Sequence, residues 1–465
     1  MAGRSFRGGL VLSVLLFCAA HPSSALGVVR DPGLVGADDP PLIEAARNRE
    51  WDVLTELLVD GADANVTTAD GTTALHWASY WDDVAAAATL LEAGADADAA
   101  NDLGATPLWN AALNGSAEMT LALLFVGADP NAPLLSGETS IMTAARTGDP
   151  EVVAVLLEAG ADPNARATRG QTALMWAAAQ RHPEAVRVLI EHGADVHARS
   201  ETWSQVMAIP PHSDPSNQQN VPHGGNTALL FAARVGDAAS ARHLLDAGAD
   251  PDDTDARGVS ATTLAAHSGF GAVVELLLEA GADPDAAGAG FAALHVAIMR
   301  RDEAVVSTIL AHGADPNVRV TNWTATRRAS ADWHFHPALV GATPFWLAAR
   351  FTQPGVMRLL AEHGADPLFV HNADYVGAAG TFGAVRRAES TTALMAAVGM
   401  GGPRRMSAFM APDRGELEAL TLEAVKVAVE FGIDVDAVDE QGRTAADAAR
   451  LPAVVDFLTG VGSRR

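Results

Sequence analysis

The 465-residue chain contains a single cysteine, Cys18, and a single lysine, Lys426. One cysteine forms neither an internal disulfide nor a zinc ribbon. The 31 basic residues face 57 acidic residues, and the resulting charge of −26 argues against nucleic-acid binding because phosphate would be repelled. Aromatic residues make up only 5% of the chain, but hydrophobic residues make up 49%. This apolar fraction excludes a disordered acidic tail, and its Ala, Leu and Val content favours helices packed through small side chains.

Sequence signatures of catalysis are also missing. The chain has no Gly-x-Ser-x-Gly, no phosphate-binding Gly-Lys-Ser/Thr loop and no His-Glu-x-x-His. The acidic segment from Asp250 to Asp255 lacks the Gly and Glu that a calcium loop needs. We therefore expect neither an enzyme nor a resident cofactor.

The N-terminus has the features of an export signal. Arg4 and Arg7 precede an eleven-residue apolar run, Leu10 to Ala20, which is short for a membrane span. Small residues up to Ala25 favour cleavage after that residue. Residues 1–25 are therefore predicted to be a signal peptide and 26–37 a linker, with an uncleaved membrane anchor as the alternative. The mature protein would have no cysteine and no membrane span, and we expect it to be periplasmic or secreted.

The remainder of the chain is repetitive. An aliphatic residue stands four positions before the Gly of a recurring Gly-Ala-Asp, and a second pattern reads Thr-x-Leu-x-x-Ala. The first pattern recurs at Gly61, Gly94, Gly127, Gly160, Gly193, Gly248, Gly281, Gly313 and Gly364, and as Gly-Ile-Asp at Gly432; the second begins at Thr73, Thr106, Thr172, Thr227, Thr343 and Thr392, with Phe345 in place of Leu in the fifth. Such a period predicts a stack of similar structural units.

Each recurring position of the unit has a physical role. The Thr hydroxyl is predicted to cap a first helix, with Pro107 and Pro344 at the first helical position. The Ala column allows helices to approach closely, and the aliphatic column fills the space between units. The Gly of Gly-Ala-Asp is expected to end the second helix in a left-handed conformation. The Asp and a following Asn favour a tight turn.

These motifs resemble the ankyrin repeat family. Thr73-Ala-Leu-His76 and Thr106-Pro-Leu-Trp109 match its helix-opening motif, and Gly160-Ala-Asp-Pro-Asn164 matches its hairpin turn. The resemblance extends over about residues 38–462 and implies an all-α ankyrin-repeat solenoid of about eleven helix-turn-helix units with hairpin fingers. More narrowly, the chain resembles exported bacterial ankyrin repeat proteins with inter-repeat insertions. The predicted division is 38–198 for repeats 1–5, 224–318 for repeats 6–8, 341–369 for repeat 9 and 390–462 for repeats 10–11, with insertions at 199–223, 319–340 and 370–389 and another near 400–416 inside repeat ten.

The insertions are rich in residues typical of protein interfaces. Their candidate binding residues are Trp203 in the first, Trp323, Arg327, Arg328, Trp333, His334 and His336 in the second, and His371 and Tyr375 in the third. Trp and Arg are enriched at interface hot spots, which favours a contact surface. The alternative is that the aromatic side chains pin each insertion to the solenoid.

Two of these histidines raise the question of a metal site. His334 and His336 would face the same way in an extended segment, and His371 is a possible third ligand. No known zinc spacing is present, so solvent-exposed or packing histidines are the alternative, and we expect no metal.

The resemblance also implies a second candidate surface. Residues that follow the Ala pair of the first helix line the concave side in this family. Here they include Tyr80, Trp81, Arg146, Arg234, Arg300 and Arg350. The Arg row could hold a carboxylate-bearing partner by bidentate pairing. Alternatively, these Arg residues only balance acidic turns, as in Asp250 and Asp252.

The expected function is that of an exported scaffold that binds a protein partner through its concave face and finger insertions, because a repeat stack offers a large rigid surface. Two alternatives stay open at this point: a metal-binding protein or enzyme with a site built by the insertions, and a secreted effector that targets a host protein. We expect a monomer, and the partner is not identified by the sequence.

Overall fold

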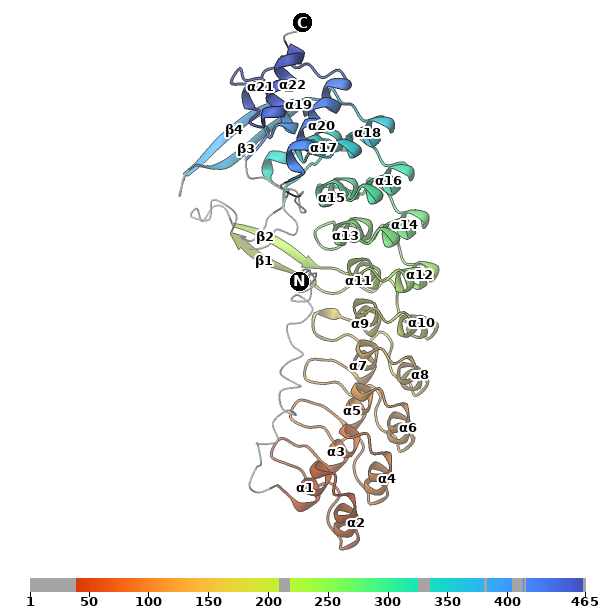
Figure 1. Cartoon of the computed structure of the whole chain (residues 1–465). Helices are drawn as coiled ribbons and strands as arrows, with labels where there is room; N and C mark the ends of the chain where they lie inside the picture. The colour runs from red at the N-terminus through yellow and green to blue at the C-terminus, as the bar shows by residue number, and fades with distance from the viewer. Residues whose placement is uncertain are drawn as a thin grey trace, which may run out of the picture.

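The computed structural model describes residues 39–208, 218–324, 335–379, 383–403, 413 and 415–462. The predicted signal peptide, the whole of the predicted linker, and the candidate residues Arg327, Arg328, Trp333 and His334 lie outside these ranges. Figure 1 shows an elongated, curved stack with α1 at one end and α22 at the other. No helix in the described part of the chain is long and apolar enough to cross a membrane.

The described residues form eleven consecutive helix pairs, which stack as two columns (Figure 1). The first helices are α1 (Pro41–Asn48), α3 (Ala74–Tyr80), α5 (Pro107–Asn114), α7 (Ser140–Thr147), α9 (Ala173–Gln180), α11 (Ala228–Val235), α13 (Ala261–Ser268), α15 (Ala293–Arg300), α17 (Pro344–Arg350), α19 (Ala393–Ala397) and α21 (Ala445–Ala448). The second helices are α2 (Trp51–Val59), α4 (Val84–Glu92), α6 (Ala117–Phe125), α8 (Pro150–Glu158), α10 (Pro183–Glu191), α12 (Ala238–Asp246), α14 (Gly271–Glu279), α16 (Glu303–Ala311), α18 (Pro354–Glu362), α20 (Leu417–Glu430) and α22 (Pro452–Gly462). The all-α ankyrin-type solenoid predicted from the sequence is therefore confirmed.

The predicted threonine caps are present at the N-termini of the first helices. Thr106 Oγ1 accepts a hydrogen bond from the Trp109 N–H, and the threonines of the other complete motifs cap in the same way. Pro107 and Pro344 occupy the first helical position. Because these bonds satisfy backbone donors that a helix leaves free, they define where each repeat begins.

The glycine of each Gly-Ala-Asp follows a second helix with positive φ, for example +93° at Gly160. A Cβ atom added at Gly160 would meet no atom within 4 Å. Backbone conformation, and not lack of space, therefore requires glycine here.

Hydrogen bonds join successive finger turns. Asp63 closes a turn by accepting from the Asn65 N–H, while the Asn65 side chain reaches the next unit. Its Nδ2 donates to the Gly94 carbonyl (2.9 Å), and its Oδ1 accepts from the Asp96 N–H (2.7 Å). The same pair of bonds is made by Asn131, Asn164 and Asn317. The asparagines thus link units as well as shape turns, a role that the sequence-based prediction did not include.

The core follows the two predicted apolar columns. The Ala column and the aliphatic column, apart from the half-buried Leu57, are fully buried between units: Ala78, Ala111, Ala144, Ala177, Ala232, Ala265, Ala297, Ala348, Leu90, Leu123, Leu156, Leu189, Leu244, Leu277, Ile309 and Leu360. Burying one Leu side chain contributes about 1.5–3 kcal/mol. The core is therefore continuous from one unit to the next.

Two β-hairpins interrupt the helical stack. β1 (Thr202–Ala208) pairs antiparallel with β2 (Gln218–Gly224), and β3 (His371–Ala379) pairs antiparallel with β4 (Gly383–Thr391). Figure 1 shows both hairpins on the side of the finger turns, away from the second helices. The prediction named insertions here but no strands. The sequence signal that it missed is the short polar/apolar alternation Asn372-Ala-Asp-Tyr375, and the structure buries Ala373 and Tyr375 while Asn372 and Asp374 are exposed, as in a half-buried strand.

Candidate functional site

The finger turns and the two hairpins form one edge of the solenoid, here called the finger edge (Figure 1). Several large apolar side chains are exposed along it: Leu103, Leu135, Val206, Leu368, Val370, Val376 and Val385. Val206 lies on the first hairpin, and Val376 and Val385 lie on the second. These residues lie along one edge from the third repeat to the second hairpin, which makes the edge a candidate interaction surface. Sequence reasoning selected Trp, Arg and His and missed these aliphatic residues.

Trp203 holds the first hairpin against the solenoid. Its ring stacks on His223 with 5.5 Å between centroids, and the Arg169 guanidinium lies 4.5 Å from its centroid. Burial lowers the pKa of His223, so its imidazole is neutral at pH 7 and stacks as an aromatic ring. A Cβ atom on Gly224 would lie 1.9 Å from the Glu201 carbonyl oxygen and 2.9 Å from the Trp203 ring, and φ is +85°, which explains the glycine here. The pinning role that we considered as the alternative applies to this half-buried tryptophan.

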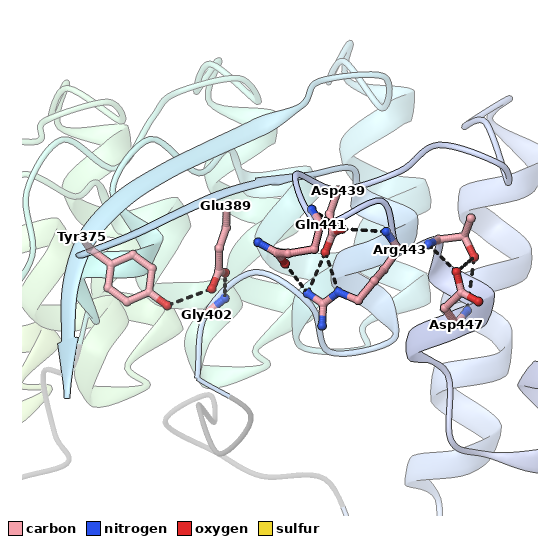
Figure 2. A network of polar contacts seen from close by, with 8 residues as sticks. Tyr375, Glu389, Gly402, Asp439, Gln441, Arg443 and Asp447 are labelled. Carbon is pink, nitrogen blue, oxygen red and sulfur yellow. Dashed lines mark hydrogen bonds and ion pairs between the residues drawn. The ribbon is translucent and has the colours of Figure 1, made fainter. Parts of the chain in front are cut away.

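A polar network lies at the base of the second hairpin, where β3 and β4 meet the segment after α19 (Figure 2). The Tyr375 hydroxyl donates to Glu389 Oε1 (3.2 Å), and the Gly402 N–H donates to Glu389 Oε2 (2.6 Å). Burial raises the pKa of Tyr375 to about 12, so its hydroxyl stays protonated and can donate. Glu389 therefore ties the hairpin to the chain that continues repeat ten.

Arg350 is buried near this network. Its Nη2 donates to the Pro403 carbonyl (3.2 Å) and its Nε to the Gly401 carbonyl (3.5 Å). Burial lowers the pKa of Arg350 to about 10, and the charge of Glu389 opposes that effect. The guanidinium is still charged at pH 7, so its cost of burial is offset by these carbonyls and by Glu389.

His371 packs inside the same base. Its Nε2 donates to the Ala338 carbonyl (2.9 Å), and the Trp346 ring lies 4.4 Å from its own. The prediction that His371, Tyr375 and Arg350 offer contact surface is wrong, because their exposed fractions are 0%, 5% and 7%. β3 packs against the short helix η4 (Pro337–Leu339) and against Trp346, which buries alternate side chains of the strand, so His371 and Tyr375 hold the hairpin instead.

The histidines do not assemble a metal site in the described residues. His336 Nδ1 accepts from the Ala338 N–H (3.0 Å), and its ring packs edge-on against Tyr375. His371 is buried, with Nε2 already donating. Within the part of the chain that the structure describes, no group of three His, Cys, Asp or Glu residues is placed to hold a metal ion. The predicted partner histidine, His334, lies outside that part, and His371 is excluded as a third ligand by its packing.

The Arg side chains on the first helices form hydrogen bonds within their own or a neighbouring repeat. Arg146 Nη2 donates to Glu138 (3.1 Å) and Arg234 Nη2 to Asn226 (3.2 Å), in each case eight residues earlier and directly before the helix cap. Arg300 Nη1 donates to the His267 carbonyl (2.6 Å) in the neighbouring repeat. Arg146 thus pairs with a nearby acidic residue, as the second alternative expected, whereas Arg234 and Arg300 bind a side-chain amide and the carbonyl of a residue in α13.

Tyr80 and Trp81 belong to an aromatic cluster at the N-terminal end of the row. The Trp81 ring lies 4.9 Å from Tyr80 and 6.5 Å from Trp77, and the Arg49 guanidinium lies 5.6 Å from it. Trp81 Nε1 donates to the Arg47 carbonyl (3.2 Å), which fixes the indole while its ring stays exposed. Among the predicted aromatic residues that the structure describes, Tyr80, Trp81, Trp203 and Trp323 retain accessible surface.

A family model and a solved structure are similar to parts of this chain. The crystal structure of the human ASB11 ankyrin repeat domain is 29% identical and covers 53% of this chain and 99% of that chain, with a TM-score of 0.43. A search of curated proteins finds no match. The family model for ankyrin repeats (three copies) matches residues 42–133, 125–200, 207–288 and 229–320, which together exceed half of the chain. Ankyrin repeats are protein–protein interaction modules, and this chain belongs to the ankyrin repeat family.

Proposed function

We propose that the protein is an exported scaffold that binds a partner protein through its finger edge and concave face. The supporting observation is the set of exposed apolar side chains on the finger turns and hairpins, because the buried core of an interface is richer in apolar area than the surface around it. The exposed ring of Trp81 adds an aromatic anchor on the first-helix side. Rigid stacking holds these groups in fixed positions and lowers the entropic cost of binding.

A paired substitution tests the finger edge. Purified protein would serve as bait in an extract of its native compartment, and bound proteins would be identified by mass spectrometry. Val376→Asp with Val385→Asp places two charges on exposed hairpin positions and should abolish capture of the specific partner. The control, Val53→Asp with Val59→Asp, makes the same change at exposed positions of α2 and should retain it. Equal capture by both double variants would refute the role of the finger edge.

The proposal that the protein is exported rests on its first 25 residues. Arg4 and Arg7, the apolar run up to Ala20 and the small residues before Leu26 support it. In a secretion-competent bacterial host, the intact mass of the exported protein should correspond to a chain that begins at Leu26. Retention of Met1 in a protein that stays in the cytoplasm would refute this part of the proposal.

A further inference from the structure

The outer face of α6 differs from the equivalent faces of other repeats. In α10 the exposed positions six and two residues before the Gly-Ala-Asp glycine are Arg187 and Glu191, which form an ion pair at 2.6 Å. In α6 the same two positions are Leu121 and Phe125, with exposed fractions of 54% and 92%. Where α10 has an ion pair on its surface, α6 thus has an apolar pair that faces solvent.

These two side chains border a surface groove. It has a volume of about 970 Å³ and runs over the outer helices α4, α6 and α8. Leu91, Leu124 and Val155 line it, and Val126 adds another exposed apolar side chain. Glu92 and Glu158 stand at its two sides, at the positions where α6 has Phe125. The groove is therefore apolar in the middle and acidic on both flanks.

The acidic border extends along the N-terminal third of the outer column. Helices α2, α4, α6 and α8 contain no Lys, Arg or His. Their six carboxylates are all exposed: Asp52, Glu56, Glu92, Glu118, Glu151 and Glu158. By contrast, α10, α12 and α18 carry Arg187, Arg242 and Arg358 on the same face, while α14 and α16 again carry only acidic charges. The exposed apolar groove thus lies among outer helices, α2 to α8, whose charged side chains are all acidic.

We propose that this groove binds an amphipathic helix of a partner protein whose apolar face is bordered by Lys or Arg. A helix of this kind buries its apolar stripe against Leu121 and Phe125 while its basic flanks meet the carboxylates. A second copy of this chain would place the same carboxylates against each other, and anionic lipid would be repelled. Phe125, as a large aromatic side chain in the centre of the patch, is the expected hot spot. This surface lies on the outer column and is independent of the finger edge.

The test is a titration followed by fluorescence anisotropy. The probe is a labelled 14-residue amphipathic peptide of Leu and Lys, and the full chain is the titrant. Two comparison peptides are needed: one with Glu in place of every Lys, and one with Ser in place of every Leu. Phe125→Glu introduces the residue that Glu92 and Glu158 supply in α4 and α8 and should raise Kd at least tenfold. Val438→Glu adds the same charge at an exposed position of the last repeat, far from α6, and should change Kd less than twofold.

Several results would overturn the proposal. Equal Kd values for the two variants would place binding elsewhere or make it a general charge effect. Equal binding of the Leu/Glu peptide would remove the need for basic flanks, and equal binding of the Ser/Lys peptide would remove the need for an apolar face. Sedimentation equilibrium adds one more outcome, because a dimer that Phe125→Glu dissociates would assign the groove to a second copy of the chain.

Discussion

His295 in α15 makes the stability of the solenoid dependent on pH. It is buried, its Nδ1 accepts from the Ala292 N–H (3.0 Å), and its Nε2 donates to the Val318 carbonyl (3.0 Å). One ring nitrogen therefore accepts and the other donates, which fits the neutral imidazole. Burial lowers the pKa of His295 from 6.5 to about 4. Protonation would remove the acceptor as well as charge a buried group.

The direction of the pH effect follows from proton binding. Between pH 6.5 and pH 4 the unfolded state binds a proton at His295 and the folded state does not, so the free energy of unfolding falls as the pH falls through this window. With these two pKa values, the loss at pH 5 relative to pH 7.5 is about 2 kcal/mol from this one residue. Stability from this source is fully present above pH 6.5.

The measurement is urea unfolding followed by circular dichroism at pH 7.5, 6 and 5. His295→Gln has no group that titrates here, so its loss of stability between pH 7.5 and 5 should be about 2 kcal/mol smaller than that of the wild type. His312→Gln alters an exposed histidine of the same repeat and should keep the wild-type profile. Parallel pH profiles for wild type and His295→Gln would refute the reasoning, because burial would then not hold the imidazole neutral.

Other predictions concern local contacts and are tested by thermal or chemical unfolding. Asp98 accepts from the Asp129 N–H but has no amide donor, so Asp98→Asn should add a bond to the Gly127 carbonyl and stabilise the protein by about 0.5–1.5 kcal/mol. Asn164→Asp should destabilise it by a similar amount. Stability changes of the same sign in both variants would contradict the role of these hydrogen bonds between finger turns. Leu277→Ala should destabilise by about 2–5 kcal/mol, and the exposed Val438→Ala by under about 0.5 kcal/mol; a similar small loss for both would contradict the continuous core. Gly401 has φ of +80°, and an added Cβ would lie 2.5 Å from the Trp346 ring, so Gly401→Ala should perturb Trp fluorescence and destabilise, whereas Gly442→Ala, also at positive φ but in open space, should destabilise without the spectral change.

The repeat unit could be predicted almost completely from the sequence. Thr106 and Pro107 begin a helix through contacts within one turn, and Gly160 ends one through its own backbone conformation. Leu277 is buried because every unit places an aliphatic residue at that position against its neighbours. These features depend on residues that are close in sequence or repeat with a fixed period, so pattern reading captures them.

The candidate surfaces could not be predicted in the same way. Tyr375 and Arg350 look like interface residues by type, yet both are buried: Tyr375 packs against His336 and Ala338, and Arg350 donates to the carbonyls of Gly401 and Pro403. Val376 looks like a core residue by type, yet its place on the outer face of β3 exposes it. A strand reverses the exposure of neighbouring residues, and only the docking of the hairpin decides which face is covered.

The sequence by itself therefore determined the family, the helix caps and the stacking, because each of these is set by local hydrogen bonds, backbone conformation and periodic burial. The tertiary structure decided which unusual residues reach solvent. Phe125 illustrates both parts. Its departure from the usual Glu is visible in the repeat, but its meaning comes from its place between α4 and α8, where an apolar groove meets an acidic border. Contacts between units are made by residues about 30 positions apart or more, as in the bond of Asn317 with Gly364 across an insertion, and only the folded stack brings them together.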